Sequence, residues 1–358
     1  MNLETILQGR SSWVGSARDP GPLVSSRIRL ARNLNGRFFP SWAEDAERSR
    51  IWKELSEFLP GLDVLHPAAA VEMSELADID KEILFERHLI SRDHLSKGEG
   101  SGFVVREDEQ VSALVNEEDH FRLQAMLPGL NLSGAWELVD ALDNQIEERV
   151  TYAFSPRLGY LTACPSNVGT GMRASVMLHL PGLVLLNEMG PIIKGMGKIG
   201  LAVRGLKGEG TEANGHLFQI SNQITLGQNE ADMVSTLEQI VLEVVEHETN
   251  ARERLMQDQE MLVRDQAGRA FGILSSAHLM QSKEALDLLS NLRLGIDLGI
   301  LPGLEGLNVD ELLLLTQPAH LQKIEGKPLK PKQRDSARAT LIRDALARAG
   351  KPGRKPRT

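Results

Sequence analysis

Five arginines in this 358-residue chain stand in stretches where their charge is unusual for the surroundings. Arg27 and Arg29 lie two residues apart in a stretch that alternates apolar and polar residues, which predicts a strand with both side chains on one face. Arg122 follows an acidic run, whereas Arg173 and Arg204 belong to glycine-rich stretches. Because a guanidinium keeps its charge and bonds phosphate oxygens in pairs, such a set would suit a polyphosphate. Ordinary exposed arginines are the alternative, and the sequence does not show whether the five converge.

The acidic run at residues 116–120 reads Asn-Glu-Glu-Asp-His and follows a strand-like stretch of apolar residues. One of its carboxylates could bind and orient a cationic nucleophile and accept its proton. A guanidinium would need such help, because its lone pairs are delocalised and it is always charged. A solvated turn is the alternative interpretation.

Two glycine-rich stretches, 164–175 and 204–215, match neither the Walker A loop nor the G-x-G-x-x-G pattern. Two glycines of the first precede a helix predicted over residues 171–180 and ended by Pro181, whose first N–H groups could approach phosphate. The second stretch carries Glu209 between glycines, which suits a mobile lid that brings a carboxylate over a substrate. An acidic surface loop is the alternative for this second stretch.

The remaining pattern predicts an α+β part followed by a helical part. Residues 101–115 predict a hairpin and residues 147–163 a second strand pair, since β-branched runs are broken there by turn residues. From about residue 230 apolar side chains recur at helical spacing. Two further helices are predicted, one that begins behind Asn308 and one over residues 334–349.

Composition excludes several classes of protein. The formal net charge of −9 argues against broad nucleic-acid binding, which relies on an overall basic surface. No run of about 18 apolar residues and no signal-peptide pattern occurs, so we expect neither a membrane span nor secretion. A single cysteine leaves no internal disulfide framework and no multi-thiolate metal site, which favours the cytoplasm.

Four motifs occur in a fixed order: SSRIRLARN (25–33), VNEEDH (115–120), CPSNVGTGMRAS (164–175) and RGLKGEGTEANG (204–215). Together with HLIS (88–91) and QISNQITLG (219–227), they resemble the phosphagen (guanidino) kinases over about residues 20–255. The resemblance implies an antiparallel sheet flanked by helices that binds ATP, with Mg²⁺ bridging the phosphates and no protein metal ligand assigned. It also implies that Glu118 is the general base and that Glu209 is a second carboxylate contact to the guanidinium.

The same resemblance assigns the nucleotide site residue by residue. Arg27, Arg29, Arg122, Arg173 and Arg204 would bind the phosphates, and His88 would border the adenine. The full set implied for ATP is Ser25, Ser26, Arg27, Ile28, Arg29, His88, Arg122, Arg173, Ala174, Ser175, Val176, Met177, Arg204, Gly205, Leu206, Lys207 and Gly208. Cys164 would lie near the guanidinium site, with a structural buried thiol as the alternative.

Two departures from the small-guanidine kinases indicate the subtype. Those kinases carry a helical domain before the SSRIR strand, but here the motif begins at Ser25, so we expect an open site that admits an arginine on a protein. A helical extension also follows residue 255. This layout resembles the bacterial protein arginine kinases, which mark proteins for Clp protease degradation during stress. The expected domains are a catalytic domain (1–255), a helical domain (256–350) and a flexible basic tail (351–358).

The helical extension contains Arg334-Asp335-Ser336-Ala337-Arg338-Ala339. Arg334 and Arg338 are i,i+4 neighbours, and such a like-charge pair costs about 0.2–0.5 kcal/mol unless an anion lies between them. The motif resembles an allosteric phosphoarginine site, formed by Arg334, Asp335, Arg338 and Ala339. A solvated helix paired internally through Asp335 is the alternative.

Three hypotheses follow: a protein arginine kinase, a small-guanidine kinase of unusual architecture, and an inactive adaptor that binds phosphoarginine proteins. The presence of every expected arginine and carboxylate counts against the adaptor. The resemblance further implies protein substrates with exposed arginines, an activator protein, a Clp ATPase or protease, and a homodimer as partners.

Overall fold

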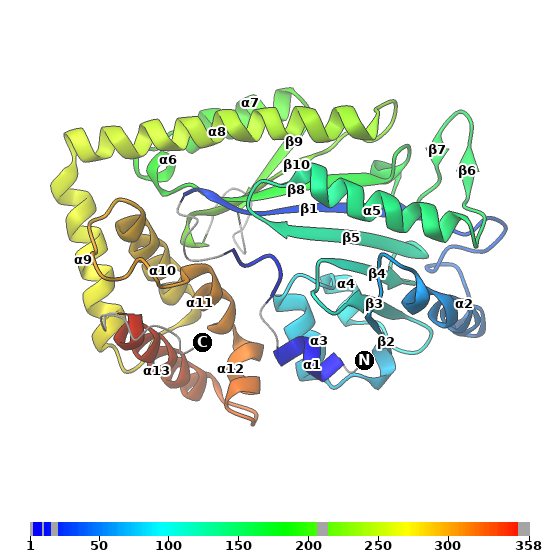
Figure 1. The fold of residues 1–358 in the computed structure, drawn as a ribbon, viewed down its shortest axis with the longest axis horizontal. Helices are drawn as coiled ribbons and strands as arrows, with labels where there is room; N and C mark the ends of the chain where they lie inside the picture. Colours follow the sequence, from blue (N-terminus) through cyan, green and yellow to red (C-terminus); the bar gives the residue numbers. More distant parts are fainter. Residues whose placement is uncertain (1–2, 9–10, 16–20, 206–213, 350–358) are drawn as a thin grey trace.

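The computed structural model describes residues 3–8, 11–15, 21–205 and 214–349, and an antiparallel sheet of eight strands lies at its centre (Figure 1). The strand order is β2 (Ala68–Glu72), β3 (Gly102–Arg106), β4 (Val111–Val115), β5 (Phe121–Pro128), β1 (Leu23–Arg32), β8 (Met172–His179), β10 (Leu217–Asn222) and β9 (Leu201–Gly205). A small separate hairpin pairs β6 (Phe154–Ser155) with β7 (Gly159–Tyr160).

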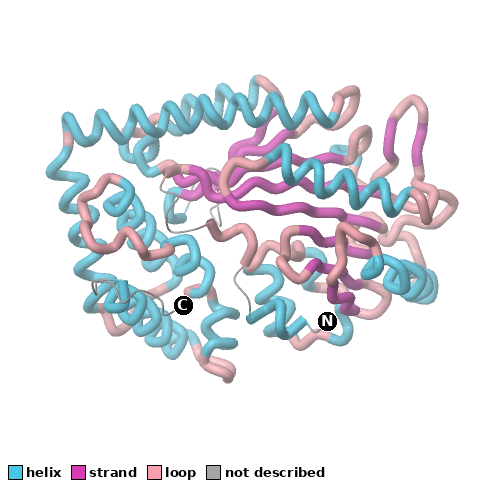
Figure 2. The backbone as a smooth tube through the Cα atoms, viewed as in Figure 1, coloured by secondary structure: helices cyan, strands magenta, loops and turns pink. Residues whose placement is uncertain are grey.

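The helices gather in two groups, around the sheet and after it (Figure 2). The first group is α1 (Leu3–Gln8), α2 (Asp45–Phe58), α3 (Asp78–Glu86), α4 (Arg92–Leu95), α5 (Leu132–Glu147), α6 (Pro181–Leu185), α7 (Met189–Lys198) and α8 (Glu230–Asp258). The second is α9 (Glu260–Ser276), α10 (Ser282–Asp297), α11 (Val309–Leu315), α12 (Pro318–Ile324) and α13 (Pro331–Ala349). This arrangement confirms the predicted α+β class, a sheet flanked by helices and followed by a helical part.

One face of the sheet is apolar and covered by helices α2, α5, α7 and α8. Ile28 and Leu30 of the central strand point to this face and are fully buried. The alternate residues Arg27 and Arg29 therefore point to the other face, because successive side chains of a strand alternate. The prediction that both arginines share a face is confirmed.

The helix predicted over residues 171–180 is wrong, because this segment forms strand β8 between β1 and β10. Met172, Ala174, Val176 and Leu178 alternate as buried residues on the apolar face, a period of two that indicates a strand. Pro181 does not end a helix but stands in the first turn of α6, where its missing N–H is tolerated. The hypothesis that a helix N-terminus here approaches phosphate falls with the helix.

The other elements predicted from the sequence are confirmed. Strands β3 and β4 form the hairpin at 101–115, and β6 and β7 form the pair within 147–163. Asn308 caps α11 by accepting a hydrogen bond from the backbone N–H of Glu311. Helix α8 extends across residue 255 to Asp258, so the helical part is joined to the catalytic part by a continuous helix.

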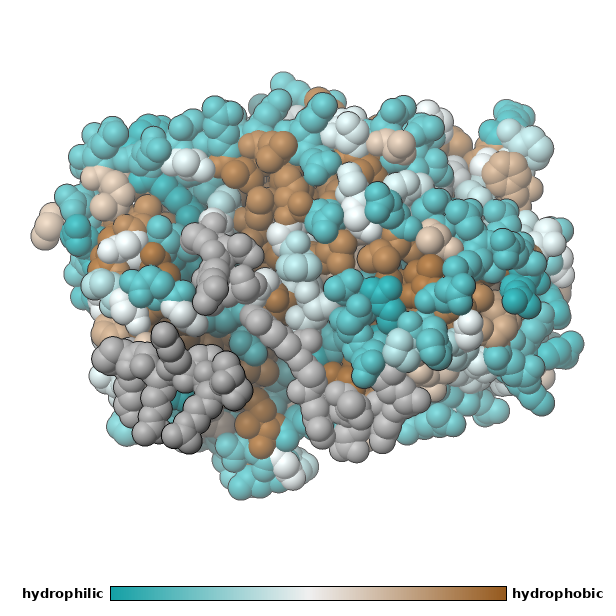
Figure 3. Space-filling model, in the orientation of Figure 1, coloured by the Kyte–Doolittle hydropathy of each residue, from teal (hydrophilic) through white to brown (hydrophobic). Residues whose placement is uncertain are grey.

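The second face of the sheet is covered at two places only within the described residues, by α1 and α3 and by the C-terminal helices. Phe103, Val105 and Leu114 pack with α1 and α3, whereas Val24 and Met177 pack with helices of the second group. Between these two covers lies the stretch of sheet that carries the arginines. In the view of Figure 3 the surface is mostly hydrophilic, with apolar residues showing in its upper centre.

The two covers meet through a buried contact between α3 and α12. The Glu86 carboxylate accepts hydrogen bonds from the backbone N–H groups of Ala319 and His320, at 2.9 and 3.1 Å, and contacts His320 Nδ1 at 2.7 Å. Both side chains are less than a tenth exposed. Glu86 therefore satisfies the first N–H groups of α12 and attaches the helical part to the catalytic part.

Across the described part of the chain, every helix is too short or too polar to cross a bilayer.

Substitution Glu86→Ala should lower the free energy of unfolding by roughly 2–4 kcal/mol, because it leaves buried donors without an acceptor. Urea unfolding followed by circular dichroism measures the loss. Glu82→Ala is the matched control, since Glu82 is exposed on the same helix and its loss should cost less than about 0.5 kcal/mol. Equal stability of the two variants would contradict the role assigned to Glu86.

Candidate active site

The five arginines converge on one face of the sheet. Arg29 on β1 is the cross-strand partner of Arg173 on β8, and Arg122 on β5 pairs with Ala31, two residues along the same face of β1. Arg204 on β9 pairs with Gln219 of β10, which in turn pairs with Met177 on the arginine-bearing face of β8. Directly paired residues of antiparallel strands share a face, so the arginines of four strands lie together.

Mutual repulsion marks this cluster as a site for an anion. Burial, followed by the charges of Arg122 and Arg173, lowers the pKa of Arg27 to about 10. The pKa of Arg29 is lowered well below its usual value by burial and then by Arg27, Arg122 and Arg173. Burial and the charges of Arg204 and Arg122 also lower the pKa of Arg173.

The cations have few protein partners. Arg27 Nη2 donates to Gln219 Oε1 at 3.0 Å, while Arg29 Nε is buried without any hydrogen-bond acceptor. Arg122 is the member that pairs with a carboxylate. A polyphosphate placed on this face would supply the missing negative charge and acceptors.

Three consecutive carboxylates at the end of the cluster have different surroundings. Glu117 is buried and accepts two bonds from Arg122 Nη1, at 2.5 and 2.6 Å, and another from the Ser91 hydroxyl. Asp119 is also buried and accepts bonds from Asn33 Nδ2 and from the Ala163 backbone N–H, at 2.5 and 2.6 Å. These two carboxylates hold the structure of the turn and of the arginine beside it.

Glu118, between them, is exposed, and its carboxylate has no hydrogen-bond partner among the described residues. Its pKa is raised, first by partial burial and then by the charges of Asp119 and Glu117. A raised pKa makes this carboxylate a better proton acceptor than an ordinary surface glutamate. Of the three carboxylates, Glu118 is therefore the one suited to act on a bound substrate.

A pocket joins these two halves of the site. It is lined by Arg29, Leu30, Ala31, Glu117, Glu118, Asp119, Arg122, Cys164, Ser166, Asn167, Gly171 and Arg173. We call it the transfer pocket, because cations for phosphate and a carboxylate for a cationic nucleophile face the same space.

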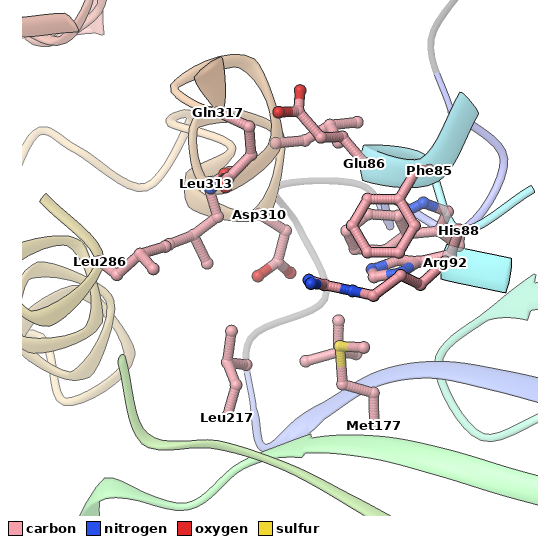
Figure 4. A pocket seen from close by; sticks show the side chains of 13 residues that line it. Phe85, Glu86, His88, Arg92, Met177, Leu217, Leu286, Asp310, Leu313 and Gln317 are labelled. Atoms are coloured by element: carbon pink, nitrogen blue, oxygen red, sulfur yellow. The ribbon is translucent and has the colours of Figure 1, made fainter. Parts of the chain in front are cut away.

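A second, more apolar pocket lies at the opposite end of the arginine face (Figure 4). Met177 lines it, four residues along β8 from Arg173 of the transfer pocket, which corresponds to about 13 Å of extended strand. His88 also lines it and packs at a tilt against Trp13, with ring centroids 5.3 Å apart. Helices of the C-terminal part supply the far wall, and Arg92 extends across the space toward Asp310 (Figure 4). We call it the base pocket, since a flat apolar base fits between its rings and aliphatic side chains.

Comparison with known proteins identifies the family. The ATP:guanido phosphotransferase C-terminal catalytic domain matches residues 51–251, and the protein-arginine kinase McsB C-terminal domain matches residues 260–357. The protein-arginine kinase of Halothermothrix orenii is 44% identical over 97% of this chain and 99% of its own length. The chain belongs to the protein-arginine kinase family. The protein-arginine kinase of Bacillus subtilis, at 42% identity, is similar over 97% of this chain and 96% of its own length.

Solved structures of guanidino kinases share the fold of this protein-arginine kinase family member. Lombricine kinase aligns with a TM-score of 0.57 and 26% identity, over 68% of this chain and 70% of that one. The duplicated taurocyamine kinase of Schistosoma mansoni, with bound transition state analog components, aligns with a TM-score of 0.59 and 27% identity, over 68% of this chain and 36% of that one.

The residues predicted for ATP divide between the two faces of the sheet. Ser25, Ser175 and Met177 lie on the arginine face, and Gly205 ends β9 beside Arg204. The side chains of Ser26, Ile28, Ala174 and Val176 point to the opposite face and are fully buried, so only their backbone atoms could contact a nucleotide. Leu206, Lys207, Gly208 and Glu209 lie outside the described residues, and their predicted contacts stay predictions.

The Arg334–Arg338 motif lies on α13 within the helical part. Arg338 is buried, and its guanidinium donates to the carbonyls of Thr316 and Met280, at 2.9 and 2.8 Å, and to Asp335 Oδ1 at 2.9 Å. Arg334 Nη1 donates to the carbonyl of Leu329 at 3.2 Å. The internal pairing through Asp335, the alternative considered for the sequence, is thus present, but in a buried rather than a solvated setting.

Several residues of the site were not predicted. The resemblance named Glu118, but it did not predict the structural roles of Glu117 and Asp119, which only tertiary contacts reveal. Trp13 lies outside every motif, and it reaches His88 only through the folding of the N-terminal segment. Cys164, in contrast, was expected near the guanidinium site; it is half-buried and lines the transfer pocket, with its sulfur 3.1 Å from the Ser166 hydroxyl.

Substitution Arg29→Met should stabilise the nucleotide-free protein by about 1 kcal/mol, because it removes from a cluster of like charges a half-buried cation whose Nε has no acceptor. The same change should abolish the rise in Tm that ATP causes in the parent protein. Thermal unfolding with and without ATP measures both effects. Arg50→Met, at an exposed position of α2, is the control and should change neither the stability nor the rise in Tm with ATP. An Arg29→Met protein that is less stable than the parent and whose Tm still rises with ATP would contradict a role of Arg29 in binding phosphate.

Proposed function

We propose that this protein transfers the γ-phosphate of ATP to the guanidinium of arginine side chains in other proteins. The observation that carries the proposal is the transfer pocket, in which the arginine cluster and the unengaged carboxylate of Glu118 face one space. The relatives named protein-arginine kinases, which match over nearly their whole length, support the choice of protein-bound arginine.

The positions of the two pockets define how ATP would lie. Its base would occupy the base pocket beside His88 and Met177, and its phosphates would cross the arginine face to the transfer pocket. Arg29, Arg122 and Arg173 would then neutralise the charge that spreads over the γ-phosphate as it moves. Positioning and neutralisation are the main contributions a protein makes to phosphoryl transfer.

The transfer exchanges one bond for another. A terminal nitrogen of the substrate guanidinium attacks the γ-phosphorus, a nitrogen–phosphorus bond forms, and the bond to the oxygen of ADP breaks. Glu118 would align the nitrogen and accept the proton that the guanidinium loses. Glu117, bound to Arg122 and Ser91, would hold a phosphate-binding arginine in place and take no proton.

Mg²⁺ is proposed as part of the nucleotide substrate. Within the described ranges, no three histidine, cysteine, aspartate or glutamate side chains are grouped to hold a metal ion. Glu117 is already bound to Arg122 and Ser91, and Glu118 is assigned to the guanidinium, so the phosphates of ATP and water would supply the ligands of Mg²⁺. The donor set therefore fits a cation carried by ATP, which would screen charge on the phosphates.

The wider role is inferred from the resemblance to bacterial protein arginine kinases. We propose that phosphorylation marks proteins for Clp protease degradation in a cytoplasmic stress response. Phosphoarginine bound at Arg334, Asp335, Arg338 and Ala339 would regulate the enzyme, and binding there would have to displace the internal bonds of Arg338. An activator protein and a homodimer remain part of this proposal.

The activity is tested by incubating the protein with ATP and Mg²⁺ and either a denatured protein or free arginine, followed by analysis of acid-labile phosphate. Label on the denatured protein is the expected result. Label on free arginine alone would favour a small-guanidine kinase, and label on neither would favour an inactive phosphoarginine-binding adaptor.

Substitution Glu118→Gln should lower kcat by about 10²–10⁴-fold, the usual contribution of a general base, with little change in ATP affinity. Glu117→Gln is the matched comparison at the neighbouring position. Because it removes the carboxylate bound to Arg122, it should weaken ATP binding as well as turnover. Steady-state kinetics measures turnover, and calorimetric titration measures ATP affinity. If Glu117→Gln lowered kcat alone and Glu118→Gln weakened ATP binding, Glu117 and not Glu118 would be the base.

A further inference from the structure

Two parts of the chain form the base pocket, and they supply different chemical groups. The sheet contributes the apolar side chains of Val24, Met177 and Leu217, which can contact the face of any flat base. Helix α11 of the helical part contributes the carboxylate of Asp310. Apolar contacts to a ring face do not tell one base from another, whereas a carboxylate does, because it accepts hydrogen bonds and donates none.

Asp310 is held in a fixed position and keeps one oxygen available. Its Oδ1 accepts a hydrogen bond from Arg293 Nη1, and Arg293 Nη2 donates to the backbone carbonyl of Gly21 at 3.0 Å. The Asp310 side chain is 16% exposed and that of Arg293 7%. Oδ2 of Asp310 has no hydrogen-bond partner among the described residues. The ion pair therefore fixes the carboxylate and leaves Oδ2 as an acceptor at the wall of the pocket.

The other polar side chains of the base pocket are engaged elsewhere or lie on the surface. Both oxygens of Glu86 accept bonds from the start of α12, and Gln317 Nε2 donates to the carbonyl of Leu313 at 2.7 Å. Arg92 extends toward Asp310 (Figure 4), but the two side chains form no ion pair among those of the described residues. Arg92 is exposed, and its planar guanidinium can lie over the face of a base. Asp310 is thus the fixed acceptor of this group.

The position of Asp310 matches the outer edge of a bound base. The transfer pocket contains Arg29 of β1, whereas the base pocket contains Val24, about 17 Å nearer the start of the same strand. Because the phosphates would bind at the transfer pocket, the sugar enters the base pocket from that side, and the opposite edge of the base faces away from it. The ion pair of Asp310 is bonded to Gly21, before the start of β1, so it lies on this far side.

We propose that Asp310 selects adenine, because its Oδ2 accepts a hydrogen bond from the exocyclic amine on the outer edge of that base. This inference rests on the proposed function, which places the phosphates on the arginine face. Guanine and hypoxanthine carry a carbonyl oxygen in place of the amine, and two acceptors that face each other form no hydrogen bond. The helical part thus determines which nucleoside triphosphate the catalytic part uses.

The test compares ATP with inosine triphosphate, which has the same sugar and phosphates but a carbonyl in place of the amine and a proton on the neighbouring ring nitrogen. Calorimetric titration in the presence of Mg²⁺ measures the two affinities. The parent protein should bind ATP roughly 10–100-fold more tightly than inosine triphosphate, the range expected when a hydrogen bond to a charged group is lost.

Substitution Asp310→Asn should reverse the polarity of this contact. The asparagine oxygen can keep the bond to Arg293, and its amide nitrogen then replaces Oδ2 with a donor. The variant should therefore bind inosine triphosphate at least as tightly as ATP. Asp297→Asn is the matched control, because Asp297 is 8% exposed and pairs with Arg252 at 2.9 Å, but does not line the base pocket. It should keep the preference of the parent protein for ATP even if its Tm is lower.

Equal affinity of the parent protein for the two nucleotides would overturn the proposal. A preference for ATP that Asp310→Asn leaves unchanged, or that Asp297→Asn removes to the same extent, would overturn it too. The ratio of two affinities is measured on one protein sample, so a partial loss of folded protein does not change it. Failure of the proposed function has a different signature: the parent protein would then bind ATP in preference to inosine triphosphate, yet transfer no phosphate to a denatured protein.

Discussion

Repulsion among half-buried arginines is the constraint on which the rest of this structure depends. Burial and the charges of neighbouring arginines lower the pKa of Arg27, Arg29 and Arg173, and Arg29 lacks an acceptor for its Nε. Such a cluster opposes folding unless other contacts outweigh it. The opposite face of the same strands supplies them, because their alternate residues pack under α2, α5, α7 and α8. The sheet thus uses the burial of one face to hold unfavourable charge on the other, ready for a polyphosphate.

The turn with three consecutive carboxylates, residues 117–119, shows how tertiary contacts give adjacent and chemically similar groups different roles. Glu117 and Asp119 are buried and hydrogen-bonded, and each holds neighbouring elements together. Glu118 is left exposed, with a raised pKa. A base suited to a guanidinium must be accessible and not already engaged, and the fold satisfies this requirement at one of three positions.

One end of the arginine face is completed by segments distant in the sequence. Helices of the C-terminal part form one wall of the base pocket. Glu86, the last residue of α3 and two residues before His88, binds the start of α12 and so connects these helices to the sheet. A change in the helical part could therefore alter the nucleotide site through this contact.

Much of the architecture could be predicted from local patterns. Alternation placed Arg27 and Arg29 on one face of a strand, and helical spacing and the Asn308 cap placed the later helices. The segment 171–180 was mispredicted because its glycines and Pro181 suggested helix boundaries, whereas pairing with strands on both sides made it a strand. Such pairing involves residues far away in the chain, which a local pattern does not contain.

The sequence by itself determined which chemical groups are present and, through its motifs, the guanidino-kinase family. It could not show that Arg204 and Arg122 approach Arg173, since sheet register decides that. Nor could the residue pattern show that Glu118, which the resemblance names as the base, is the one carboxylate of the three that the fold leaves exposed. Only the tertiary structure decided these points, because burial, shared faces and pockets depend on contacts between distant segments.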